Sequence, residues 1–524
     1  MPEYLRALIY VLIISAPALY IAGKIAVPLI GEVEFRLWRN CWIIATCATF
    51  LSRSFFDFAA ALAIMSIYIH RNSKQPILFY VILMFVAPCV PIGVGIPGVF
   101  NRIIDLDPPR LLAIVILLPI AIRLWREIDN RQLRGPDILV IAFFVYISML
   151  ALRLGDLNSI LRVVPGYFLD ILLPYFVFSR SLRSALEINQ VLLAFVVTAL
   201  PLAAIGFFEI WRNWRIYYVV VLEWDVMLIT VYLFRDGFLR AATTSVESIA
   251  FGFLCMTGGG CLLALRTPTP LGPWRYAALG VLMIGLLSSV SRGPWLGFAL
   301  CVMMLLMTNL RVSFKLLLGM FPAVATLIFL HPSFIDRFTN LLPFVGSADR
   351  GSETYRSRLF ENSMIVIERY PFFGSDTFVH EPEMQTMIQG QGIVDVVNTY
   401  LQISLHYGLI GLLLFVMFFG VLGIKLSTLF WRNKSDIVSY EGVLALLAAM
   451  LFTIATTSSV SIIPYIYWPF SGLCAALLAL GPGIEWEFSR DARARMQSLG
   501  TGLAHPIIPS SDGIKKMRVL GVRR

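Results

Sequence analysis

The chain has 524 residues, of which 58% are hydrophobic and 14% charged, with a formal net charge of +10. Its mean hydropathy is +0.79, and it repeatedly contains apolar stretches near the roughly 20 residues that a helix needs to cross a bilayer. This composition excludes a soluble globular enzyme. The positive charge needs no nucleic-acid partner, because membrane topology and anionic lipid headgroups account for it.

The apolar stretches predict an all-α, polytopic membrane bundle with about 12–14 spans, because backbone amides in hydrocarbon must be satisfied within their own segment. They lack the alternating pattern and short spacing of barrel strands. The predicted spans are 5–27, 41–69, 76–97, 109–123, 137–153, 163–179, 188–208, 245–265, 273–290, 294–309, 313–331, 399–424, 441–460 and 462–481.

Segment 41–69 is long for one crossing and carries Arg53 and Asp57 near its middle. These residues fit an ion pair four positions apart in one tilted helix, or a break between two half-helices. We favour one helix. The predicted organisation is then membrane helices over 1–331, one large periplasmic loop over 332–398, further membrane helices over 399–481 and a basic cytoplasmic tail over 482–524.

Lysines and arginines of the short loops fall on one side when the spans are numbered in order, and the positive-inside bias makes that side cytoplasmic. An even number of spans places the N-terminus and the tail there as well. Arginines nevertheless gather on the opposite face, where this bias depletes them. They are Arg212, Arg215, Arg235, Arg240, Arg292, Arg350, Arg356 and Arg358.

Guanidinium groups bind phosphate oxygens with paired hydrogen bonds, so these arginines predict a phosphorylated lipid headgroup as ligand. Each arginine also has a plainer interpretation. Arg292 fits an interfacial arginine at a helix end, Arg212 and Arg215 fit an amphipathic interfacial helix, and Arg356 and Arg358 fit a solvated face.

Other polar residues near the predicted loop are candidates for acid–base chemistry. Asp395 fits either a helix cap or a general base, and His380 fits a base or a surface loop residue. His406 fits a packed polar residue, while Asp170 and Glu247 at span positions indicate a polar cavity. The glycines of the loop suit a lid, with Gly390-Gln-Gly392 as its hinge.

Short motifs follow one another in an informative order. Leu239-Arg240-Ala241 precedes a span, Ser291-Arg292-Gly293 lies between two spans, and Arg356-Ser-Arg358 leads to Tyr370-Pro-Phe-Phe-Gly374. Asp395-Val-Val-Asn398-Thr-Tyr400 then precedes Tyr407-Gly408. This succession, over roughly residues 230–425, resembles the bacterial O-antigen ligase and polymerase superfamily, whose members are integral-membrane glycosyltransferases.

The resemblance implies roles for individual residues. Arg292 and Arg356 would hold the diphosphate of a lipid-linked donor, with Arg358 and Arg240 as further candidates, and Asn398 and Tyr400 would complete the motif at the end of the loop. The ligase branch typically has His immediately before this Asn and assigns a base to it. Val397 stands there instead, which favours the polymerase branch, with Asp395 as the corresponding acidic residue.

The resemblance also implies the setting of the reaction. It predicts a GT-C-like bundle in the bacterial inner membrane with its active face in the periplasm, using undecaprenyl-diphosphate-linked glycan and a glycan or lipid-linked acceptor, with no metal or other cofactor. Membrane lipids, a chain-length regulator and a flippase are the other expected partners. A ligase, a flippase or a scaffold of the export machinery remain alternatives.

Overall fold

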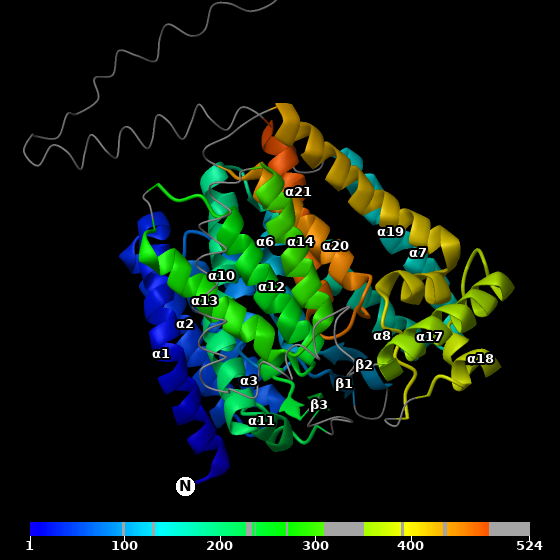
Figure 1. The fold of residues 1–524 in the computed structure, drawn as a ribbon, viewed down its shortest axis with the longest axis horizontal. Helices are drawn as coiled ribbons and strands as arrows, with labels where there is room; N and C mark the ends of the chain where they lie inside the picture. The colour runs from blue at the N-terminus through cyan, green and yellow to red at the C-terminus, as the bar shows by residue number, and fades with distance from the viewer. Residues whose placement is uncertain are drawn as a thin grey trace, which may run out of the picture.

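The computed structural model describes residues 1–96, 100–127, 132–226, 233–235, 237–268, 271–308, 350–388, 392–432 and 438–481. Figure 1 shows a bundle of roughly aligned helices, with shorter helices and two hairpins gathered toward one end. Four predicted features lie wholly or largely outside the described residues. They are the span 313–331, the part of the 332–398 loop before α17, the Gly390-Gln-Gly392 hinge and the tail from 482.

The first half of the chain supplies the following elements. They are α1 (Glu3–Ile30), α2 (Glu32–Leu51), α3 (Phe55–Asn72), α4 (Ile77–Leu83), β1 (Ile92–Ile96), β2 (Phe100–Leu106), α5 (Pro108–Leu112), the π-helix η1 (Ala113–Leu117), α6 (Leu118–Arg126), α7 (Gly135–Leu150), η3 (Ala151–Leu154), α8 (Leu157–Tyr167), η4 (Phe168–Leu172), α9 (Leu173–Ser181) and α10 (Ala185–Arg212).

The second half supplies the remaining elements. They are α11 (Tyr218–Glu223), β3 (Phe234–Arg235), β4 (Phe238–Leu239), η5 (Thr243–Ser245), α12 (Ser248–Ala264), α13 (Pro273–Ser288), α14 (Arg292–Thr308), α17 (Arg350–Arg369), η6 (Phe378–His380), α18 (Pro382–Gln385), α19 (Thr399–Arg432), α20 (Tyr440–Ile454) and α21 (Ile463–Leu480).

The prediction of a polytopic helical membrane protein is confirmed. Within the described residues, 7 helices are long and apolar enough to cross a membrane, and four shorter apolar helices of 10–17 residues accompany them. Eleven of the predicted spans coincide with helical segments, namely 5–27 and the ten described ones from 109–123 onward. Hydropathy located them because lipid selects for uninterrupted apolar sequence.

The prediction of one helix over 41–69 is wrong. α2 ends at Leu51 and α3 begins at Phe55, with Ser54 at the N-cap of α3. The Ser54 hydroxyl accepts the amide of Asp57 at 3.3 Å, and the Asp57 carboxylate accepts the amide of Ser54 at 3.1 Å. This capping box satisfies two amides at a helix start, so Asp57 serves the break instead of pairing with Arg53.

The contacts at the two ends of α1 bear on the predicted position of the N-terminus. The Arg6 guanidinium lies 5.0 Å from the ring centroid of Trp214, just past the end of α10, in the segment predicted to be extracytoplasmic. At the other end of α1, the Lys24 amine lies 5.9 Å from the ring of Trp274, in a segment predicted to be cytoplasmic. The start of α1 and the segment after α10 therefore lie at the same end of the bundle, whereas the predicted topology put them on opposite sides of the membrane.

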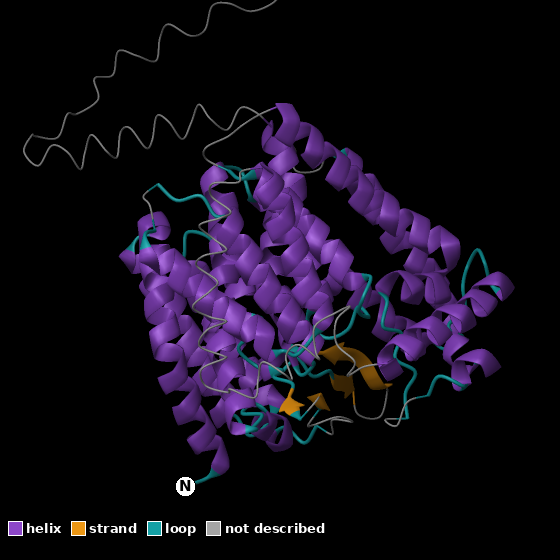
Figure 2. Cartoon of the chain, viewed as in Figure 1, coloured by secondary structure: helices purple, strands orange, loops and turns teal. Residues whose placement is uncertain are grey.

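Two small hairpins accompany the helices, and the first of them replaces half of the predicted span 76–97. β1 pairs antiparallel with β2, and β3 pairs with β4. Figure 2 shows both hairpins at the same end of the bundle. Pro88 and Pro91 stop the helical run after α4, since proline lacks an amide hydrogen and clashes with the preceding turn. The glycines from 93 to 98 have GxGxxG spacing, but a hairpin does not provide the strand–helix turn of a dinucleotide site.

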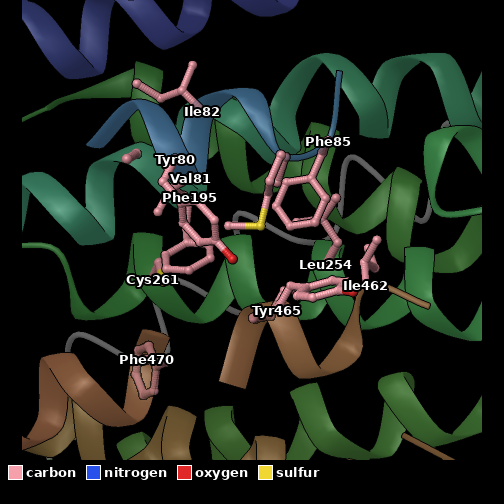
Figure 3. Packing of buried hydrophobic residues seen from close by; sticks show 14 of the residues in the cluster. Tyr80, Val81, Ile82, Phe85, Phe195, Leu254, Cys261, Ile462, Tyr465 and Phe470 are labelled. Carbon is pink, nitrogen blue, oxygen red and sulfur yellow. The ribbon is translucent and has the colours of Figure 1, made fainter. Parts of the chain in front are cut away.

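The core is centred on α10 and α12, whose side chains are buried almost throughout. Figure 3 shows Tyr80 and Phe85 from the α4 region packing with Phe195, Leu254 and Tyr465 from α10, α12 and the start of α21. In a bilayer such packing replaces lipid contacts, so close fit and small residues decide which helices associate. The three consecutive glycines at 258–260 accordingly contact three different neighbours, from α10, α14 and α20.

A glycine-mediated contact joins α19 to the segment after α17. Gly408 breaks α19 with φ 68° and ψ −173°, and Gly374 has φ 65°. A Cβ at Gly408 would lie 2.3 Å from the Phe372 carbonyl oxygen, and one at Gly374 would lie 2.5 Å from the Leu405 carbonyl oxygen. The two short motifs that end in these glycines therefore pack backbone to backbone.

We expect Gly408→Ala to lower the apparent melting temperature of the purified protein. The backbone conformation alone costs about 1–3 kcal/mol for a residue with a Cβ, and the clash with Phe372 adds to it. Gly420→Ala in the same helix is the control, because nothing lies within 4 Å of a Cβ there. Equal melting temperatures for the two variants would show that the close approach is not required.

Candidate functional site

Asp395 lies in the short segment between residue 392 and α19, and three elements hold that segment. The Ser458 hydroxyl donates to Asp395 Oδ1 at 3.2 Å, and the Tyr355 hydroxyl donates to the Asp395 carbonyl oxygen at 3.0 Å. Val396 is buried in a small apolar cluster with Leu359 of α17 and Leu405 of α19. The carboxylate is thereby fixed at the junction of α17, α19 and the residues after α20.

The connector between α20 and α21, residues 455–462, meets each of the other site segments. Its Thr456 carbonyl accepts a hydrogen bond from Arg356 Nη2 at 3.4 Å, and its Thr457 carbonyl accepts the Thr399 amide at 3.0 Å. A Cβ at Gly293 would lie 2.4 Å from the Thr456 hydroxyl oxygen, so the first turn of α14 rests against it. Arg292 begins that turn.

Arg240 approaches the same place from the strand β4. Its Nη2 donates to the Ser291 hydroxyl at 2.9 Å, directly before Arg292. The charges of Arg240 and Arg356 both act on the Asp395 carboxyl, which places these two arginines around it. The structure thus brings Arg240, Arg292, Arg356 and Asp395, which are far apart in sequence, to one end of the bundle.

Glu247 is a second acidic residue of this site. Burial raises the pKa of Glu247, Arg215 and Arg240 lower it, and the charge of Asp395 raises it. Burial likewise raises the pKa of Asp395, against the lowering effects of Ser458, Arg356 and Arg240. The site therefore holds two carboxyl groups that resist ionisation and arginines that favour it.

The segment 241–247, which joins Arg240 to Glu247, is held by hydrogen bonds from neighbouring elements. The buried Glu209 carboxylate accepts the amides of Ala242 and Thr243 at 3.1 and 3.0 Å, and Arg215 Nη2 donates to the Val246 carbonyl at 2.9 Å. Val246 has φ 65° and, beside Ser291, Val290 has φ 47°. Positive φ at a β-branched residue is strained, and such strain persists only where surrounding contacts enforce it.

Two predicted site residues are placed differently. Arg356 and Arg358 are both exposed on α17, but Arg358 is turned about 200° around the helix from Arg356, and only Arg356 is described as bonded to the connector. His380 is exposed in η6, and its amide donates to the Thr377 carbonyl at 2.8 Å. Its neighbours Glu381 and Glu383 form ion pairs with Arg369, so in the described residues this segment is organised around Arg369.

Asn398 and Tyr400 have structural contacts at the start of α19. The Asn398 side-chain oxygen accepts the amides of Tyr400 and Leu401 at 2.9 and 3.2 Å, which makes Asn398, not Asp395, the cap of this helix. The Tyr400 hydroxyl donates to the Leu451 carbonyl of α20 at 3.1 Å. These contacts fix the direction in which α19 leaves the site.

An apolar groove of about 570 Å³ begins at Tyr400 and follows α19 along α20. Phe415, Phe419 and Leu444 line it, and Trp431 marks its far end. Its lining is almost wholly apolar, and neighbouring side chains such as Leu413 and Ile424 are exposed. The groove therefore suits an alkyl or isoprenoid chain leading away from the polar site.

The sequence did not single out the connector residues Thr456, Thr457 and Ser458. The signal was present as an unbroken run of Thr and Ser between two apolar spans, from 456 to 459. Glu209 was also missed, because it lies at the end of an apolar span without any motif. Among the described residues, no group of three or more His, Cys, Asp or Glu side chains is arranged to hold a metal ion.

The fold and site define a polytopic helical membrane protein with an arginine- and carboxylate-lined site at one end and an apolar groove leading from it. Residues 277–416 match the family model described as O-Antigen ligase, so the chain carries a domain of that family. The match includes Arg292, Arg356 and Asp395, whereas Arg240 and the connector lie outside it. A comparison with curated proteins finds no match.

The family match supports glycan transfer of the O-antigen ligase or polymerase type and lipid-linked glycan substrates. It covers fewer residues than the motif resemblance, which ran from about 230 to 425. The roles of the individual site residues therefore remain predictions.

A designed disulfide tests whether α14 and the connector meet as described. The Thr456 Cβ would lie 3.5 Å from a Cβ at Gly293, which is within the range for a disulfide. We expect Gly293→Cys with Thr456→Cys to cross-link on mild oxidation, as detected by mass spectrometry of non-reduced peptides. Gly280→Cys with Thr456→Cys is the control, since nothing lies within 4 Å of a Cβ at Gly280. Cross-linking in both pairs, or in neither, would contradict the described contact.

Proposed function

We propose that this protein transfers glycan from an undecaprenyl-diphosphate-linked oligosaccharide at the periplasmic face of the bacterial inner membrane, polymerising exopolysaccharide or O-antigen repeat units. The observation that carries the proposal is that Arg240 and Arg356 act on the Asp395 carboxyl while Arg292 begins the helix turn packed against the same connector, within and beside an O-antigen ligase family domain. A diphosphate is the anion that suits several convergent guanidinium groups.

In the proposed reaction, an acceptor sugar hydroxyl attacks the anomeric carbon of the donor. The bond from that carbon to the diphosphate oxygen breaks, the bonding electrons leave with the diphosphate, and the hydroxyl proton passes to a base. Negative charge grows on the leaving oxygens, and arginines already held by Ser291 and the Thr456 carbonyl stabilise it without reorganising. The start of α14 at Arg292 adds the positive end of a helix dipole.

Asp395 is the proposed base. A positioned general base contributes about 10²- to 10⁴-fold, and its efficiency is greatest when its pKa lies near the working pH. Burial moves the pKa of Asp395 upward, in the direction that makes the carboxylate more basic, while Ser458 orients it. Glu247 is close enough to interact with it electrostatically and shares the same arginine.

The groove along α19 is the proposed path of the donor's isoprenoid chain. It includes Tyr400, two residues after the helix cap at Asn398. Its lining is apolar, and nearby apolar side chains of α19 such as Leu413 and Ile424 are exposed. A chain lying there would hold the diphosphate beside the arginines and leave the glycan in water. The remote binding energy of the chain could then contribute to positioning the reacting centre.

Ligation to lipid A core is the second candidate, and the description of the matched family favours it. Polymerisation is preferred because Val397 occupies the position of the ligase-branch His and Asp395 supplies an acidic residue nearby. Reconstitution with a defined donor, and either the same donor or lipid A core as acceptor, separates the two reactions by their products.

We expect Arg292→Lys and Arg356→Lys each to reduce glycan transfer at least about tenfold while the protein remains folded. Losing one charge-assisted hydrogen bond costs roughly 1.5–3 kcal/mol, since a lysine cannot reproduce the forked contact. Arg358→Lys is the matched comparison on α17 and should retain activity. Single-turnover transfer in proteoliposomes provides the measurement. Normal transfer by Arg292→Lys would refute its assigned role.

The pH dependence of transfer tests the base. Because Asp395 must be ionised and burial raises its pKa, activity should fall on acidification at a pH above the ordinary carboxyl value of 3.8. This acid limb of the pH profile should persist in Glu247→Gln, which keeps Asp395 together with Ser458, Arg356 and Arg240. The limb should be absent from the residual activity of Asp395→Asn. An unchanged limb in that variant would exclude Asp395 as the base.

A further inference from the structure

A basic cleft of about 610 Å³ lies at the end of the bundle opposite to the arginine–carboxylate site. Arg134 lines it just before α7, Lys425 and Arg432 line it from the last turns of α19, and Ala475 and Leu478 of α21 form an apolar wall. Figure 1 shows α7 and α19 running side by side toward this end. The cleft therefore combines positive charge with apolar surface between three helices.

The positive charge of the cleft is not neutralised by the carboxylate nearest in sequence. Asp137 is buried and accepts Arg180 Nη1 at 3.0 Å and the Tyr175 hydroxyl at 2.7 Å, while its other oxygen accepts the Arg134 amide at 2.6 Å. The Arg134 side chain donates instead to the Ser179 carbonyl at 2.8 Å. Both Asp137 oxygens thus already accept hydrogen bonds, from Arg180, Tyr175 and the Arg134 backbone amide.

Lys425 and Arg432 are exposed, and within the described part of the chain neither forms an ion pair. The Lys425 amine lies against the first turn of α7, where a Cβ at Gly135 would be 2.9 Å from it. A glycine at 135 therefore leaves room for the amine beside Arg134. Arg134, Lys425 and Arg432, the last about two turns further along α19, all line the cleft, and three cations around one cleft favour a ligand with an anionic group.

The surroundings of the cleft indicate that this ligand is a lipid. Trp431, beside Arg432, is 82% exposed, Ile424 is 70% exposed and Ile138 on α7 is 57% exposed. Exposed apolar side chains on membrane helices face lipid, and exposed tryptophan is typical of the headgroup level. A phosphate in the cleft would therefore lie at the interface, with its acyl chains along α7 and α19.

We propose that this cleft binds the phosphate headgroup of an anionic phospholipid in the leaflet opposite to the glycan-transfer site, and that the bound lipid stabilises the packing of α7 and α19 against α21. The lysine and arginine bias predicts that leaflet to be cytoplasmic, where basic pockets between helices suit anionic headgroups. The proposal does not depend on which reaction the distant site performs.

The test compares the full-length protein with two double variants that remove equal charge. Lys425→Gln with Arg432→Gln empties the cleft of two cations. Arg71→Gln with Lys74→Gln removes two exposed cations at the end of α3, on the same predicted side. Each protein in neutral detergent is titrated with cardiolipin, with phosphatidylcholine or with inorganic phosphate, and apparent melting temperature and lipid retention in native mass spectrometry are recorded.

We expect cardiolipin to raise the melting temperature of the unaltered protein and of the α3 variant, and to bind the cleft variant about tenfold more weakly or worse. Lys425→Arg with Arg432→Lys, which keeps the charge, should restore binding and so separates a lost site from a misfolded protein. Equal weakening in both Gln variants would overturn the proposal, as would equal stabilisation by phosphatidylcholine. Stabilisation by inorganic phosphate alone would assign the cleft to a soluble anion and also overturn it.

Discussion

The geometry of the site depends on the hydrogen-bonding requirement of the short connector between α20 and α21. Polar backbone near the apolar region of a membrane protein must find partners within the protein. The Thr456 and Thr457 carbonyls find theirs in Arg356 and Thr399, and the Ser461 hydroxyl donates to the Ser245 carbonyl at 2.5 Å. Satisfying the connector thus fixes α17, α19 and the segment before α12 relative to one another.

The same arrangement sets the electrostatics. Asp395 and Glu247 both have raised pKa values because burial disfavours their charge, and Arg240 opposes that effect at both. Arg215 donates a hydrogen bond to the Val246 carbonyl and also interacts electrostatically with the buried Glu209 carboxylate. The site is therefore neither a neutral cavity nor a closed ion-pair network. An entering polyanion would add negative charge next to arginines that are already oriented, which is the condition for electrostatic stabilisation of a leaving diphosphate.

Hydropathy predicted most helices because lipid imposes a simple rule on each segment separately. It failed where a local signal opposed the average: the Ser54–Asp57 capping box divides 41–69, and two prolines end the helix after α4. The order of the short motifs predicted Arg292, Arg356 and Asp395 as site residues, and folding brings all three to one end of the bundle. The connector could not be found in this way, since its partners Arg356 and Asp395 are 100 and 63 residues away from it in sequence and only folding brings them together.

α19 shows how one helix can carry two unlike surfaces. At about 100° per residue, Gly420, Gly423 and Ser427 fall on one face, and these residues line the apolar groove. Lys425 lies about 200° around the helix from Gly423, and Arg432 lies about 140° from Ser427; both line the basic cleft.

The helix from Leu409 to Arg432 is about 36 Å long, enough to cross the hydrocarbon core, and the basic cleft lies along its last turns only. Small residues on the first face make room for a chain beside the helix, while long cations near the end of the second reach an interface. Because Asn398 caps the same helix beside the arginine–carboxylate site, α19 has fixed contacts at that end of the bundle as well.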